Sequence, residues 1–68
     1  MNFSNRLKEL RLASGLSQKE LGNLIGSTYS AICYWENGIN EPKISYLIAL
    51  CKVFNVSADY LLGLSDVI

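Results

Sequence analysis

A capping box followed soon after by a glycine restricts the middle of this chain to short helices. Ser17 and Glu20 stand three residues apart, a spacing at which the serine hydroxyl and the glutamate carboxylate each bond to the other residue's backbone N–H. Gly26 then supplies a residue that tolerates the left-handed conformation in which helices end. A helix of only a few turns is unstable alone. This segment must therefore pack against neighbouring helices.

Capping residues and glycines divide the rest of the chain in the same way. Apolar spacing at i, i+4 and i+7 predicts a helix over residues 4–14, which Gly15 ends. Ser27 or Thr28 is expected to cap a helix that stops at Asn37. The inward-facing residues that this spacing predicts before residue 38 are Phe3, Leu7, Leu10, Leu21, Leu24, Ile25, Ile32 and Trp35.

The last third of the chain predicts two more helices. The segment before Pro42 cannot continue a helix, because a residue that precedes proline is pushed into an extended conformation. Ser57 is expected to cap a short last helix that Gly63 ends. A helix from about Ile44 to Phe54 is predicted to bury one stripe, formed by Ile44, Leu47, Ile48, Cys51 and Phe54. No alternating pattern typical of a strand is present, so the sequence predicts a compact all-α fold of five helices.

Composition limits the chemistry that the chain can perform. Its 68 residues suffice for a single domain covering positions 1–68, and none of them is histidine. The commonest acid–base catalyst and metal ligand is therefore missing. Cys33 and Cys51 stand alone, without the paired spacing of a zinc site. We expect no metal, no cofactor and no enzymatic activity.

Charge and hydropathy indicate a neutral protein of the cytoplasm. Six Lys and Arg residues balance six Asp and Glu residues. Four cations and two anions fall within residues 1–35, so the first part of the chain is the one suited to an anion. The first ten residues do not match a signal peptide, and the apolar run from Tyr46 to Cys51 is too short to span a membrane.

Two short helices joined by a tight glycine turn predict a helix-turn-helix over about residues 17–37. In DNA-binding proteins of this kind, the second helix lies in the major groove. The chain closely resembles the phage repressor/Cro-like, or XRE, family. The motifs that carry the resemblance are RLKELR at 6–11, GLSQ at 15–18, Gly26, WENG at 35–38, Pro42 and NVSADYLLG at 55–63.

The resemblance implies a lambda-repressor-like domain that binds double-stranded DNA sequence-specifically and regulates transcription, with repression the expected mode. It implies a bacterial or phage-encoded protein associated with the nucleoid. Arg11 and Glu36 match the family's internal ion pair. The residues that match family positions in contact with DNA are Gln18, Thr28, Tyr29, Ser30, Cys33, Tyr34, Asn37, Asn40 and Lys43.

The sequence departs from the family pattern at three places. Gly22 replaces the usual alanine where the two helices cross, Ser27 replaces an apolar residue, and Tyr34 stands where a basic residue is frequent. Without arginine on the third helix, the commonest specific contact to guanine is missing. We therefore expect A·T-rich contacted positions and a shallow salt dependence, because few basic residues face phosphate.

A second copy of the domain is one expected partner. One such domain covers one half-site, so a two-fold dimer is expected through the fifth helix and the tail. The apolar residues available for it are Tyr60, Leu61, Leu64, Val67 and Ile68.

The alternative function is a protein-interaction module of the same fold, which binds an antirepressor, a toxin or a polymerase through its third helix.

Overall fold

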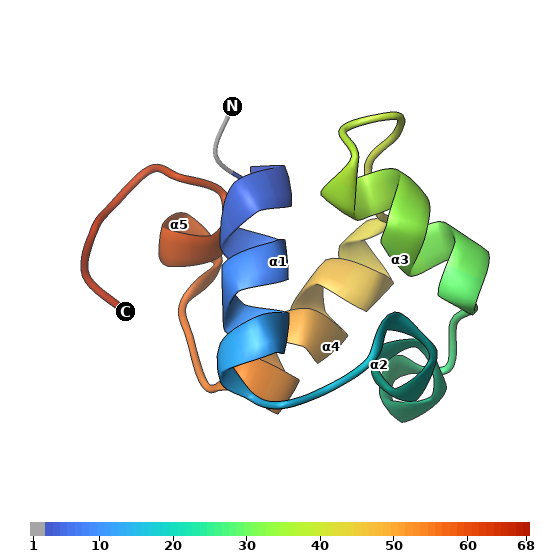
Figure 1. The fold of residues 1–68 in the computed structure, drawn as a ribbon. Coiled ribbons are helices and arrows are strands. Elements are labelled where there is room, and N and C mark those ends of the chain that lie inside the picture. The colour runs from blue at the N-terminus through green and yellow to red at the C-terminus, as the bar shows by residue number, and fades with distance from the viewer. Residues whose placement is uncertain (1–2) are drawn as a thin grey trace.

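Five short helices follow one another along residues 3–68, the part of the chain that the computed structural model describes (Figure 1). No strand occurs within these residues, which confirms the all-α class. The helices are α1 (Phe3–Ala13), α2 (Gln18–Ile25), α3 (Tyr29–Glu36), α4 (Ile44–Phe54) and α5 (Ala58–Leu61).

Local signals account for where these helices begin and end. The capping box is present: Ser17 Oγ accepts from the Glu20 N–H at 3.0 Å, and the Ser17 N–H donates to Glu20 Oε1 at 2.8 Å. Gly26 ends α2 in the left-handed conformation, with φ of 73°. Thr28, rather than Ser27, caps α3, because Thr28 Oγ1 accepts from the Ala31 N–H at 3.1 Å. Ser57 caps α5 in the same way.

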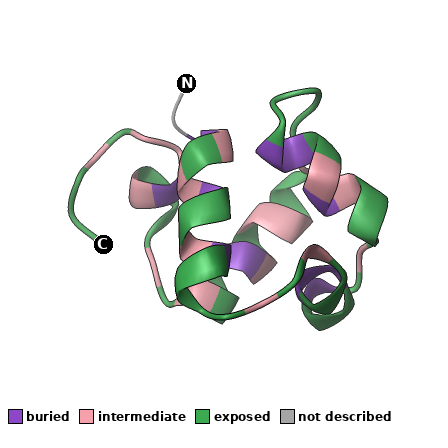
Figure 2. Ribbon diagram, viewed as in Figure 1, coloured by how far each residue is buried: buried purple, intermediate pink, exposed green. Residues whose placement is uncertain are grey.

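The helices enclose one core, to which each contributes at least one fully buried side chain (Figure 2). Helix α3 packs against α2 and α1, α4 packs against α2 and α5, and α5 packs against α1. The buried apolar residues are Phe3, Leu7, Leu21, Ile25, Ile32, Trp35, Leu50 and Leu61.

The predicted inward faces of α2 and α4 were wrong in part. Leu24 is exposed, because α3 crosses α2 at the buried Gly22, and this turns Leu21 and Ile25 inward. On α4 the fully buried residue is Leu50, whereas Ile44 and Ile48 are 75% and 51% exposed. The other three residues of the predicted stripe, at positions 47, 51 and 54, are half-buried.

A polar clamp ties the end of the chain to α1. Arg6 Nη1 donates to the carbonyls of Tyr60 and Ser65, each at 2.5 Å, and Arg6 Nη2 pairs with Asp66. The Arg6 guanidinium also lies 4.2 Å from the centre of the Tyr60 ring. Leu61 is completely buried, so it cannot serve as the dimer contact that was expected of it. No helix within residues 3–68 has the length and apolar character needed to cross a membrane.

Candidate nucleic-acid interface

Helix α3 approaches α2 unusually closely at a glycine. A Cβ atom placed on Gly22 would lie 2.9 Å from the carbonyl carbon of Thr28 and 3.2 Å from the backbone nitrogen of Tyr29. Contacts this short do not leave room for an alanine methyl group. Gly22 therefore allows the first turn of α3 to rest directly on α2, and the three residues 26–28 form the turn between the helices.

The inner face of α3 is held by buried side chains. Ile32 and Trp35 are both buried in the core. The Trp35 ring packs against the Tyr46 ring of α4, with 5.6 Å between their centres and planes inclined by 45°. The Tyr46 hydroxyl in turn donates to the carbonyl of Gly26, at 3.5 Å. These contacts fix the rotation of α3 and therefore decide which residues face outward.

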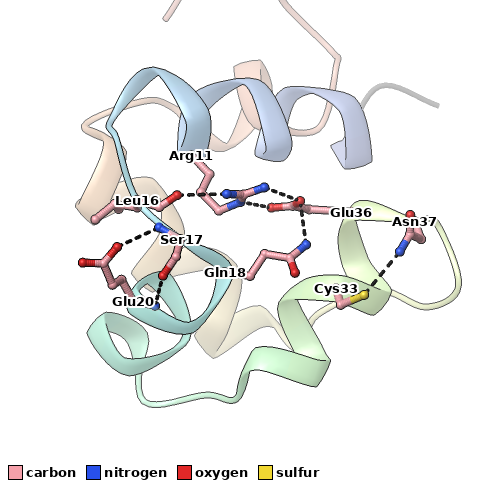
Figure 3. Close-up of polar contacts among 8 residues, drawn as sticks. All are labelled: Arg11, Leu16, Ser17, Gln18, Glu20, Cys33, Glu36 and Asn37. Atoms are coloured by element: carbon pink, nitrogen blue, oxygen red, sulfur yellow. Dashed lines mark hydrogen bonds and ion pairs between the residues drawn. The ribbon is translucent and has the colours of Figure 1, made fainter.

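The outer face of α3 carries neutral side chains that protrude from the domain. Tyr29 and Tyr34 are 56% and 45% exposed, and Ser30 is also exposed. Cys33, one of the predicted contact residues, is half-buried, and its Sγ accepts from Asn37 Nδ2 at 3.4 Å (Figure 3). Hydroxyl groups and aromatic edges suit this face for contact with base edges or with another protein.

A buried ion pair joins α1 to the end of α3 (Figure 3). Arg11 Nε lies 2.6 Å from Glu36 Oε2, and Arg11 Nη2 lies 3.0 Å from Glu36 Oε1. Arg11 Nη1 donates to the carbonyl of Leu16 at 2.9 Å. The hydrogen bonds to Glu36 raise the pKa of Arg11. The pair expected from the sequence is thus formed with two parallel bonds, a geometry specific to arginine.

Gln18 belongs to the same network, a contact that the sequence did not predict. It is the first residue of α2, and its Nε2 donates to Glu36 Oε1 at 3.1 Å (Figure 3). The network is complete, because no buried side-chain nitrogen or oxygen of residues 3–68 lacks a hydrogen-bond partner. Gln18 lies 18 positions from Glu36 along the chain, so only the packing of α2 against α3 could reveal this contact.

The remaining predicted site residues lie at the two ends of α3. Thr28 precedes the helix, and its hydroxyl is engaged in the cap. Asn37 follows the helix, and Asn40 and Lys43 lie in the exposed segment that leads to α4. Asn40 also lines a hollow of about 500 Å³ between this segment and the start of α1. The predicted contact residues therefore lie along α3 and at its two ends, except for Gln18, which begins α2.

Two helices joined by a three-residue turn, with the second seated on a glycine of the first, define a helix-turn-helix domain. The family model described as "Helix-turn-helix" matches residues 7–61. The chain belongs to this helix-turn-helix family, of the phage-repressor or XRE type.

Known proteins of the family are similar over nearly the whole chain. The HTH-type transcriptional regulator ImmR of Bacillus subtilis is 34% identical over 98% of this chain, which corresponds to 53% of ImmR. The chain spans between 33% and 57% of the length of three of the curated relatives that it matches.

Solved structures share the fold. The P22 c2 repressor, determined in complex with a synthetic operator, superposes with a TM-score of 0.84 at 34% identity, over 87% of this chain and 89% of the repressor chain. The N-terminal DNA-binding domain of SinR from Bacillus subtilis superposes with a TM-score of 0.82 at 29% identity, over 90% of each chain. The lambda-repressor-like fold implied by the sequence is thereby confirmed.

Proposed function

We propose that this chain, as one helix-turn-helix domain over positions 1–68, binds double-stranded DNA sequence-specifically and regulates transcription, with α3 in the major groove. One observation carries the proposal: buried contacts at Ile32 and Trp35 fix α3 while its outer face stays open. The solved complex of the P22 c2 repressor with an operator, and the regulatory role in the name of ImmR, support it. Repression is the proposed mode.

The position of each residue suggests its role in the complex. Tyr29 and Ser30, in the first turn of α3, are proposed to contact base edges, and Tyr34 to contact sugar or phosphate one turn later. Gln18 and Thr28 are proposed to contact phosphate from the starts of α2 and α3, where backbone N–H groups also favour an anion. The residues proposed to approach the DNA backbone or bases from the rest of the interface are Cys33, Asn37, Asn40 and Lys43.

The neutral face of α3 predicts how the operator is read. Serine bonds to any base, whereas aromatic and apolar groups suit the thymine methyl, so contacted positions are expected to be rich in A·T pairs. A few phosphate contacts per monomer correspond to a log–log slope of affinity against salt of about −2 to −4. A slope near −8 per monomer would contradict this account of the surface.

Binding-site selection from random duplexes, followed by mobility shifts at two salt concentrations, tests the proposal. Tyr29→Ala and Gln18→Ala are expected to weaken binding to the selected site. Glu9→Gln, an exposed position on α1 outside the proposed contacts with DNA and with a second copy, is the matched control and should leave binding unchanged. Failure to select any sequence, or G-rich sites contacted by Tyr29, would contradict the proposed readout.

A homodimer in the cytoplasm is proposed as the binding species. Half-sites of such operators lie about 34 Å apart, and two copies are needed to read both. With Leu61 buried, the exposed Leu64, Val67 and Ile68 and the half-buried Tyr60 remain available for the contact. Sedimentation of the free protein at micromolar concentration should show dimers, and a monomer alone would count against this interface.

A second function is favoured by the same uncharged face. Two exposed tyrosines on a helix that carries no lysine or arginine suit a protein surface as well as a duplex. The partner in that case is an antirepressor, a toxin or a polymerase subunit. The mobility shift distinguishes the two functions, since a protein-interaction module would not retard any selected duplex.

A further inference from the structure

The side-chain amide of Gln18 is oriented by a charged neighbour. Its Nε2 lies 3.1 Å from Glu36 Oε1. A carboxylate only accepts hydrogen bonds, so the amino group, and not the carbonyl oxygen, of Gln18 must face it. The opposite orientation would place two acceptor oxygens against each other. The chemistry of Glu36 thus selects one of the two amide orientations.

The carboxylate that makes this selection cannot itself turn away. Arg11 holds both of its oxygens, at 2.6 Å and 3.0 Å, and Arg11 is fixed in turn on the Leu16 carbonyl. The side chains of Arg11 and Glu36 are 10% and 3% exposed, so little water competes for these bonds. Gln18, which is half-buried, lies at the solvent end of this chain of contacts.

We propose that Glu36 is a positioning residue for the protein–DNA contact, acting through Gln18. With one N–H committed to Glu36, Gln18 keeps one N–H and its carbonyl oxygen for the duplex, in a fixed direction. The rotamer is therefore set before binding, and less side-chain freedom is lost in the complex. This inference rests on the proposed DNA-binding function and assigns Glu36 a role besides its ion pair.

A double-mutant cycle on DNA affinity tests the proposal. The variants are Gln18→Ala, Glu36→Gln and their combination, compared with the unaltered protein on the selected operator, at a temperature where circular dichroism shows each to be folded. Each single change is expected to weaken binding about threefold to tenfold, the equivalent of one hydrogen bond. On the Gln18→Ala background, Glu36→Gln is expected to change affinity less than twofold, because the group that it positions is gone.

Equal losses on both backgrounds would overturn the proposal, since they would show that Glu36 supports the fold and not Gln18. Glu9→Gln is the matched control: the same substitution in an exposed carboxylate of α1, a helix that carries none of the proposed DNA contacts. It should leave affinity unchanged. If the unaltered protein binds no duplex, the proposed function fails and this inference fails with it.

A second measurement needs no variant of the buried pair. Gln18 is the only glutamine in the chain, so its side-chain amide gives a distinct NMR signal. In the free protein, we expect the Gln18 side-chain amide to be as rigid as ordered backbone, with an order parameter of about 0.85. The exposed side-chain amide of Asn23 is expected to be mobile. A value below about 0.6 for Gln18 would overturn the proposal even if Glu36→Gln does not fold.

Discussion

Replacing Gly22 by alanine has two opposing effects on the free energy of unfolding. Alanine is better than glycine in a helix interior by about 1 kcal/mol. The added Cβ, however, would lie 2.9 Å from the carbonyl carbon and 3.0 Å from the carbonyl oxygen of Thr28. These are backbone atoms at the N-cap of α3, so they cannot swing aside as a flexible side chain would. Relief requires α3 to move away from α2.

The steric effect is expected to dominate. Overfilling a packed contact costs about 1–3 kcal/mol, which exceeds the gain in helix propensity in most of that range. We expect Gly22→Ala to lower the free energy of unfolding by about 1 kcal/mol, and the melting temperature by about 4–8 °C. DNA affinity should fall as well, because Gln18 on α2 and Tyr29 on α3 would no longer keep their relative positions.

Thermal and denaturant unfolding monitored by circular dichroism measure this effect. Asn23→Ala is the matched control, because it lies next to Gly22 on α2, is exposed and gains helix propensity without a steric contact. It should raise the melting temperature slightly. The reasoning would be refuted if Gly22→Ala stabilised the domain as much as Asn23→Ala does or more.

Three further predictions concern other parts of the domain. Arg6→Ala should lower the free energy of unfolding by about 1–3 kcal/mol and speed amide hydrogen exchange over residues 60–66. Lys8→Ala, at an exposed position, is the control, and unchanged exchange in Arg6→Ala would show that the clamp is weak. Thr28→Ala should lower the free energy of unfolding by about 1 kcal/mol, because it removes the hydroxyl that caps α3. Thr28→Ser keeps a capping hydroxyl and should retain most of that stability in unfolding experiments. Burial raises the pKa of the Cys51 thiol above its ordinary value of 9.0. A pKa that is higher in the folded than in the unfolded state stabilises the fold. This stabilisation is complete below pH 9 and is lost as the pH rises through the pKa that Cys51 has in the folded state. In a Cys33→Ser variant, alkylation of Cys51 should show a midpoint above pH 9.0, and a midpoint at or below 9.0 would contradict the effect of burial.

The positions of the helices followed from local chemistry. A cap bond such as that from the Glu20 N–H to Ser17, or a left-handed residue such as Gly26, involves atoms within a few residues of one another. Such interactions are readable in sequence, because the spacing alone brings the atoms together. The residues of the candidate interface were named on a different basis, because they match positions of the family motifs.

The rotation of each helix was decided only by tertiary structure. Helix α4 reads ISYLIALCKVF, with apolar residues almost all round, so its periodicity could not distinguish Leu50 from Ile44 as the residue to bury. The positions of α2 and α5 against it made that choice. The bond from Gln18 to Glu36 likewise spans 18 residues and exists because α2 and α3 cross at Gly22. Contacts between distant residues depend on how whole helices pack, and no local pattern encodes that geometry.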